Sequence, residues 1–252
     1  MYWLTYRFNT FMNFFMEFFR IAVLYFLWSA VYENSVNKII GGYSFHEMTA
    51  YVFISVFIFS YTSGDTIFSV SSKIKDGKIV QELIKPVDFQ FRFFISDLAS
   101  KSIISLLNLL SFLVILYFFN IPCPENISLW IIFLVSVFLA GCIHFFIEFI
   151  ISLLSFYVTN LWGIVITSEA IFEFFSGALI PLSFFPPFLM DICKILPFQY
   201  VIYVPVNIFL GKIPLNNCYE ILFIQFFWTL ILLIAGRILY NHALKKIVIH
   251  GG

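Results

Sequence analysis

Ionisable residues recur at helical spacing inside apolar stretches of the chain, and these side chains are the best placed to do chemistry. Glu169 and Glu173 lie one helical turn apart, with Ser168 beside them. A charge near the centre of a bilayer costs about 2.5–3.5 kcal/mol, so an ionisable group at that depth is a candidate for function. The two carboxylates could contact a cationic or polar group. Alternatively, one or both are protonated or hydrogen-bonded within the chain.

Two further pairs combine groups of opposite charge. His144 and Glu148 are spaced i, i+4, and so are Asp97 and Lys101. Neutralisation at this spacing lowers the cost of insertion, so we interpret both pairs as mainly structural. A His/Glu pair without further ligands is a poor metal site, and we expect no metal.

The motifs of common enzymes are incomplete or missing. His46 and Glu47 begin like the H-E-x-x-H motif of metalloproteases, but the second histidine is lacking. There is no G-x-S-x-G nucleophile motif. There is also no G-x-x-x-x-G-K-[ST] loop, so the chain cannot hold ATP phosphates itself. We therefore expect a non-catalytic protein that binds no cofactor of its own.

The composition indicates the environment in which these ionisable residues lie. Of 252 residues, 62% are apolar and 11% charged, against roughly 45–50% and 25% in a soluble domain. This excludes a water-soluble globule. Fourteen Lys and Arg balance fourteen Asp and Glu, which leaves no basic surface for nucleic acid.

The apolar runs predict an all-α membrane protein with a single transmembrane domain over residues 1–252. About 20 apolar residues span a bilayer as a helix, and no strand-length alternation suggests a barrel. Six spans are expected, at about 11–32, 49–70, 99–119, 129–156, 161–180 and 218–240.

The distribution of cations predicts the orientation. With both termini in the cytosol, eleven cations lie on the inner side, and only Lys38, Lys194 and Lys212 lie outside. This bias follows the positive-inside rule for a multi-pass protein of the plasma membrane.

A polar stripe precedes the first span. We interpret it as an interfacial helix that bends into the span, with Trp3 and Tyr6 at headgroup level; an ordinary helix end anchored by aromatic residues is equally compatible. The stripe consists of Arg7, Thr10, Asn13, Glu17 and Arg20.

The inner loop 71–92 is long for a connection between helices. A turn is expected at Lys75-Asp76-Gly77, then two helical turns over 78–85, which Pro86 ends. Such a short amphipathic helix suits docking into a groove of another protein. The alternative is a solvated, positively charged loop.

The outer segment 181–217 is apolar but cannot form an unbroken span, because prolines interrupt it. We expect a re-entrant helical hairpin. Irregular backbone at membrane depth must pack against protein or line a cavity, so the hairpin should lie at the mouth of a cavity.

At these segments the chain resembles the permease subunits of ABC exporters of the second type, the ABC type-2 permeases. The small bacterial subgroup that is often paired with a second permease and a separate ATPase is the most similar. The resemblance covers nearly the whole chain and rests on motifs in 7–28, on I-x-x-G-x-I and L-x-K-P-V-x-F in 74–89, on G-x-L-I-P-L-x-F-F-P in 177–186, and on L-P-F, Y-x-P and L-G in 196–211.

The resemblance implies an N-terminal connecting helix, a cytosolic coupling helix, two short re-entrant helices, and partners that include ABC ATPase subunits and a second permease. ATP and Mg²⁺ would be bound by the partner ATPase. The residues implied to couple to it are Lys75, Asp76, Gly77, Lys78, Ile79, Leu83, Ile84, Pro86 and Phe89, with Ile79, Leu83 and Ile84 as the docked apolar face. The candidate translocation path is Asp65, Ser168, Glu169, Phe172, Glu173 and Ser176. The candidate outer gate is Pro181, Phe185, Pro186, Pro197, Phe198 and Pro205.

The function predicted from the sequence is therefore the permease subunit of an ATP-driven exporter of amphipathic or lipid-like molecules, such as a drug, a peptide or a lipid-linked molecule. The alternative is a membrane immunity or binding protein that sequesters a membrane-active peptide without transport. A membrane enzyme or channel is the third class, and it lacks the catalytic or pore-lining groups it would need.

Overall fold

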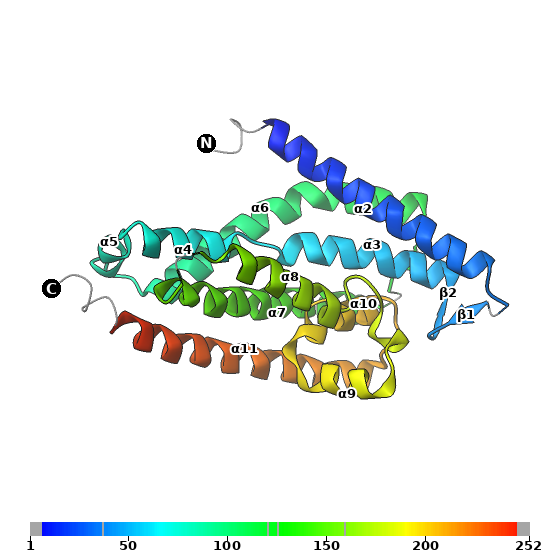
Figure 1. Ribbon diagram of the computed structural model, residues 1–252. Coiled ribbons are helices and arrows are strands. Elements are labelled where there is room, and N and C mark those ends of the chain that lie inside the picture. The colour runs from blue at the N-terminus through cyan, green and yellow to red at the C-terminus, as the bar shows by residue number, and fades with distance from the viewer. Residues whose placement is uncertain (1–6, 37, 120, 125, 159, 246–252) are drawn as a thin grey trace.

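The structure is a computed structural model that describes residues 7–36, 38–119, 121–124, 126–158 and 160–245 (Figure 1). These residues form an all-α fold apart from one short hairpin. In chain order the elements are α2 (Arg7–Glu33), β1 (Ile39–Ile40), β2 (Tyr43–Ser44), α3 (Phe45–Thr62), α4 (Thr66–Lys75), α5 (Ile79–Leu83), α6 (Phe89–Phe118), α7 (Ile127–Ser152), η1 (Leu153–Phe156), α8 (Trp162–Ser176), η2 (Leu182–Phe184), α9 (Pro187–Ile195), η3 (Pro197–Tyr200), α10 (Tyr203–Phe209) and α11 (Leu215–Leu244).

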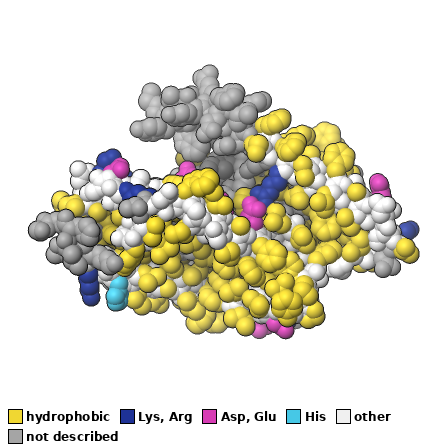
Figure 2. Space-filling view, in the orientation of Figure 1, with side chains coloured by type: hydrophobic (Ala, Val, Ile, Leu, Met, Phe, Trp, Pro, Cys, Tyr) yellow, Lys and Arg dark blue, Asp and Glu magenta, His cyan; other side chains and the backbone are white. Residues whose placement is uncertain are grey.

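Helix α7 is the centre of the fold, because α11, α4, α10 and α3 all pack against it. Figure 1 shows α5 and the end of α11 at one end of the molecule, and the hairpin β1–β2 at the other. The surface seen in Figure 2 is largely hydrophobic along its length, as expected for a protein surrounded by lipid.

Among the described residues, three helical segments are long and apolar enough to cross a membrane: Phe45–Lys75, Ile127–Phe156 and Leu215–Leu244. A fourth candidate is the pair Pro187–Ile195 and Pro197–Phe209, which is bent by 74°. Helices α2 and α6 have 27 and 30 residues, whereas α8 has 15 and ends at Ser176, four residues before the predicted end of its span. Gly177 ends α8 in the left-handed conformation, with φ +83°.

The second predicted span is one helix in the sequence prediction but two in the structure. Helix α3 ends at Thr62 and α4 begins at Thr66. Glycine is a poor helix former, and a Cβ at Gly64 would lie 2.8 Å from Oδ1 of Asp97, so this close approach requires glycine. The break therefore lies beside a charged side chain of α6.

The structure shows no break in the helix before the first predicted span. Helix α2 runs without interruption from Arg7 to Glu33, and it contains neither glycine nor proline. The side chains of Arg7, Thr10, Asn13 and Glu17 lie outside the described part of the structure, as do Trp3 and Tyr6.

A two-stranded hairpin precedes α3. Gly41 and Gly42 form its turn with φ of 57° and 85°, values that favour glycine. Ser44 and Glu47 then form a capping box at the start of α3. Glu47 also lies 2.8 Å from Nζ of Lys212. Glu47 of the His46-Glu47 sequence is thus part of a structural cap.

Among the described residues two large apolar clusters hold the helices together, and a third, small one of Ile67, Leu161 and Val165 lies at the starts of α4 and α8. The larger of the two joins α3, α7 and α10, with Ile54, Ile143 and Ile208 fully buried. The smaller of the two lies toward the α5 end and includes Val70, Ile79, Phe89, Phe149 and Tyr240. Phe89 stacks on Tyr240 with ring centroids 5.0 Å apart, which links the start of α6 to α11.

The connections at the two ends follow the predicted turn and proline signals. Gly77 has φ +69° after α4, and α5 covers Ile79–Leu83, which is shorter than the predicted 78–85. In the outer segment, Pro187 starts α9 and Pro197 starts η3, where their missing N–H groups cost no helical hydrogen bond.

Candidate functional site

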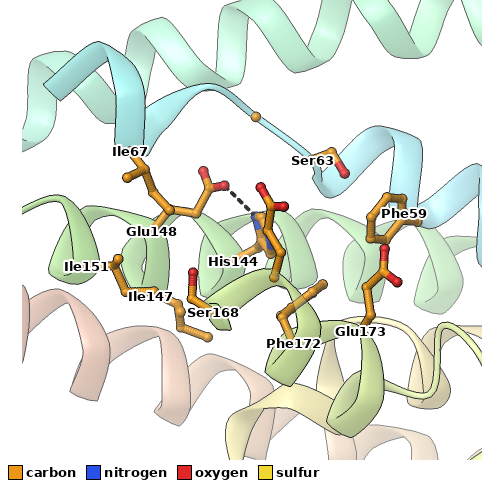
Figure 3. A pocket seen from close by; sticks show the side chains of 12 residues that line it. Phe59, Ser63, Ile67, His144, Ile147, Glu148, Ile151, Ser168, Phe172 and Glu173 are labelled. Atoms are coloured by element: carbon orange, nitrogen blue, oxygen red, sulfur yellow. Dashed lines mark ion pairs between the residues drawn. The ribbon is translucent and has the colours of Figure 1, made fainter. Parts of the chain in front are cut away.

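A small cavity lies where the α3–α4 break faces α7 and α8. Phe59, Ser63, Gly64 and Ile67 line it from the broken helix. From α7 and α8 it is lined by His144, Ile147, Glu148, Ile151, Ser168, Glu169, Phe172 and Glu173 (Figure 3). Its volume of about 100 Å³ is room for a few water molecules or one small polar group, not for a drug-sized molecule.

The cavity brings together four of the six residues predicted for a translocation path, namely Ser168, Glu169, Phe172 and Glu173. The other two are elsewhere. Asp65 is exposed at the start of α4. Ser176 is fully buried, and its hydroxyl donates to the backbone oxygen of Glu173 at 3.4 Å.

The His144–Glu148 pair forms part of the cavity wall. Nδ1 of His144 is 4.0 Å from Oε1 of Glu148, and both side chains are about nine-tenths buried. The imidazole packs edge-on against Phe172, with ring centroids 4.4 Å apart. No group of three His, Cys, Asp or Glu that could hold a metal ion occurs among the described residues.

The Asp97–Lys101 pair lies next to the cavity, on α6. Nζ of Lys101 is 2.7 Å from Oδ2 of Asp97, and the Lys101 side chain is only 1% exposed. Thr66 donates a hydrogen bond to Asp97 at 3.3 Å. The pair therefore fixes α6 to the first turn of α4, which agrees with its structural interpretation.

Arg20 is a member of the site that sequence reasoning did not place there. Its guanidinium lies 3.4 Å from Oε1 of Glu173 and 4.3 Å from the centre of the Phe59 ring. One signal was available: a cation at spanning depth needs a partner. Choosing Glu173 as that partner required knowledge of how α2 and α8 pack.

The predicted docking face of α5 is only partly exposed. Leu83 is 43% and Ile84 78% exposed, but Ile79 is 3% exposed and packs in the smaller core cluster. Ile79 thus departs from the prediction, because it anchors α5 instead of facing outward. Val80 and Val87, each about half exposed, extend the apolar surface in its place.

Glu82 points from α5 into the protein, and three cations surround it. Nζ of Lys73 and Nζ of Lys85 lie 3.5 and 2.9 Å from its carboxylate, and Arg92 pairs with the same group. Burial raises the pKa of Glu82, but hydrogen bonds from Lys85 and Arg92 outweigh it and hold the pKa below its usual value. Sequence reasoning missed this carboxylate, since nothing local distinguishes it from a solvated glutamate.

The other predicted coupling residues surround α5. Lys75, Asp76, Lys78 and Pro86 are exposed, and Lys78 pairs with Asp76 at 3.0 Å. Phe89 is buried against Tyr240.

Two of the predicted gate residues, Phe185 and Phe198, pack against aromatic side chains of α8. Phe185 stacks on Phe174 with centroids 4.8 Å apart, and Phe198 lies 6.2 Å from Phe172 of the cavity wall. Pro181, Pro197 and Pro205 are buried and Pro186 is exposed. The outer segment is thus in direct contact with the helix that carries the two carboxylates.

The chain belongs to the ABC-2 family of transporter proteins. The family model described as "ABC-2 family transporter protein" matches residues 18–251. The predicted resemblance is thereby confirmed. No curated protein and no solved structure matches the chain. Members of this family are generally non-catalytic membrane components that partner with ABC ATPase subunits. The match gives no support to the alternative of a sequestering immunity protein.

Proposed function

We propose that this chain is the permease subunit of an ATP-driven exporter in the plasma membrane, with both termini in the cytosol. Separate ATPase subunits bind ATP and Mg²⁺, and a second permease subunit completes the translocation path. Family membership supports the permease assignment, and the bias of cations toward one side supports the orientation. The segment around α9 and α10 would be a re-entrant hairpin at the outer end.

The observation that carries this proposal is the exposed apolar surface of α5, a short helix that buried contacts fix to the body of the protein. Leu83 and Ile84 project outward, while Ile79 and Glu82 hold the same short helix to the body of the protein. Exposed apolar side chains beside a positively charged loop are costly in water and suit a groove of a protein partner.

Contacts that follow α5 in the chain also provide a way to transmit its movement to other helices. Phe89, the first residue of α6, stacks on Tyr240 of α11, and Asp88 just before it pairs with Arg237 of α11. A displacement of α5 by an ATPase would therefore act on α6 and α11 together. Such coupling requires contacts that differ between two states of the transporter.

We further propose that the carboxylates of α8 meet cationic or polar parts of an amphipathic or lipid-like cargo. Because the cavity is small, it would accept one polar group, and the rest of the cargo would lie along the interface with the second subunit.

The test is purification of the tagged full chain from its native membrane, followed by measurement of ATP hydrolysis and of ATP-dependent uptake of ethidium, an amphipathic cation, into inside-out vesicles. We expect a co-purifying ATPase and ATP-dependent uptake. The double variant Leu83→Asp/Ile84→Asp should abolish ATPase binding. The control is Val36→Asp, because Val36 is fully exposed in the connection between α2 and β1. Full ATPase binding by both variants would reject the docking assignment.

A further inference from the structure

A second pocket lies beside the loop that joins α4 to α6 and contains α5, and it has an excess of positive charge. It lies between the last turns of α4, the loop and the first turns of α6, and it has a volume of about 500 Å³. Three basic side chains line it, together with the Glu82 carboxylate and three serine residues; the basic ones are Lys73, Lys85 and Arg92. Three cations share one carboxylate, so the pocket carries a formal charge of about +2.

The cations have hydrogen-bonding capacity that Glu82 cannot use. Two ammonium groups and one guanidinium present about eleven N–H donors, whereas a carboxylate accepts about four hydrogen bonds. All three cations remain partly exposed, with 39%, 48% and 28% of the Lys73, Lys85 and Arg92 side chains accessible. The serine residues add little charge, since the hydroxyls of Ser69 and Ser72 each donate to a backbone oxygen three residues earlier. The pocket is therefore suited to an anion that accepts several hydrogen bonds.

The position of the pocket indicates where that anion comes from. Ser69 and Ser72 belong to the end of the apolar segment Phe45–Lys75, and Ser96 to the third turn of α6. Beside them in the chain, Phe68 and Ile95 are half exposed and offer apolar surface at the same level of their helices. Charged groups next to apolar surface at the end of a span match the headgroup and acyl chains of a lipid. The outward face of α5, in contrast, is apolar, with Leu83 and Ile84 exposed.

We infer that this pocket binds the phosphate headgroup of an anionic phospholipid in the cytosolic leaflet. Lys73, Lys85 and Arg92 contact the phosphate oxygens, and Glu82 holds the three cations in place between them. The cytosolic assignment rests on the orientation proposed above. Lipid binding itself does not need an ATPase, so the two proposals can fail separately.

The test measures lipid retention by the purified full chain with native mass spectrometry. Phosphatidylglycerol and phosphatidylcholine are offered at equal concentration, since both contain a phosphate but only the first has a net negative charge. We expect the wild-type chain to retain phosphatidylglycerol preferentially. Equal retention of the two lipids would overturn the inference.

A matched pair of variants locates the site. Lys73→Gln/Lys85→Gln removes two charges from the pocket, whereas Lys75→Gln/Lys78→Gln removes two from the exposed part of the same loop. The first should weaken phosphatidylglycerol binding about 30-fold, from the usual contribution of a basic residue to anionic lipid binding, and the second should leave it near the wild-type value. Equal affinities of the two variants would contradict the proposed site.

The pocket variant also removes partners of Glu82, so a second variant keeps all three cations. Ser72 is exposed in the pocket, and Ser72→Asp adds a negative charge there, with Ser72→Asn as its neutral control. Only the aspartate should reduce binding, by about fivefold, which is the effect of one charge on the same scale; unchanged binding would overturn the inference. Soluble glycerol phosphate at millimolar concentration separates the two sources of phosphate. Failure to displace the lipid supports a lipid site, and displacement would reject it in favour of a free phosphate.

Discussion

Arg20 and Glu173 form an ion pair between α2 and α8, with 3.4 Å between Nη2 of the arginine and Oε1 of the glutamate. Each side chain is about three-quarters buried, and the arginine also covers the Phe59 ring. The pair joins the first helix of the chain to the helix that carries the two carboxylates. Glu173 is consequently already neutralised, while Glu169 has no ion-pair partner among the described residues.

The Arg20–Glu173 pair should stabilise the protein measurably. In a double-mutant cycle with Arg20→Gln and Glu173→Gln, we expect a coupling free energy of about 1 kcal/mol, near the upper value for an exposed pair because this one is partly buried. Each single variant should lower the midpoint of thermal unfolding in detergent by about 2–4 °C. A coupling free energy of zero would show that the ion pair contributes nothing.

Glu169 is the better candidate for contact with cargo, since its carboxylate lines the cavity without a counter-ion in the described structure. We expect Glu169→Gln to reduce ATP-dependent ethidium uptake several-fold while the thermal midpoint changes by less than about 1 °C. Glu173→Gln should instead lower the midpoint. Unchanged uptake by Glu169→Gln/Glu173→Gln in a normally assembled complex would exclude the cargo role of both.

Gly64 should not tolerate a side chain. A Cβ there would lie 2.8 Å from Oδ1 of Asp97, which cannot retreat without disturbing its ion pair with Lys101. We expect Gly64→Ala to destabilise the protein by about 1–3 kcal/mol, measured by SDS-induced unfolding. The control is Gly163→Ala, because nothing lies within 4 Å of a Cβ at Gly163 of α8. That variant should be neutral or stabilising by up to about 1 kcal/mol, since alanine is the better helix former.

Lys101 should be essential to the fold only while Asp97 is charged. Lys101→Met leaves a buried carboxylate without its cation, which costs about 3–5 kcal/mol. The double variant Asp97→Leu/Lys101→Met removes both charges and should recover most of that loss. Expression level and unfolding in SDS report both effects; equal instability of the single and double variants would contradict this account.

Glu82 should make the α5 end of the protein sensitive to acid. Its pKa is lower in the folded chain than its ordinary value of 4.5, so its ion pairs stabilise the fold fully above that pH. This stabilisation is lost as the pH falls through the lower folded pKa. We expect the wild-type chain to have a higher thermal midpoint than Glu82→Gln at pH 7, and the difference to shrink below pH 4.5. A difference that does not change with pH would refute the role of the charge.

Local signals in the sequence were sufficient to predict the turn and short helix around Gly77 and Pro86. The i, i+4 spacing likewise predicted the pairs Asp97–Lys101 and His144–Glu148. Each of these features depends on residues a few positions apart, so the helical repeat fixes their relationship. The Gly41-Gly42 turn carried a comparable hairpin signal that the apolar pattern obscured.

Contacts between distant segments could not be derived in this way. The burial of Ile79 and Glu82 depends on α6 and α7, and the pairing of Arg20 depends on how α2 meets α8. The close approach of Asp97 of α6 to Gly64 at the helix break likewise joins distant segments. In each case local propensity is compatible with the observed structure but does not select it, since packing decides between alternatives of similar local free energy.

The interruption between α3 and α4 also changes the electrostatics of the membrane interior. Peptide dipoles in a continuous helix add up to a partial charge only at its two far ends, whereas a broken helix has a positive end and a negative end within the span. The positive end is the first turn of α4, where Thr66 donates to Asp97. Roughly half a unit of positive charge thus lies next to a buried carboxylate. The backbone itself therefore offsets part of the cost of placing an acid at this depth.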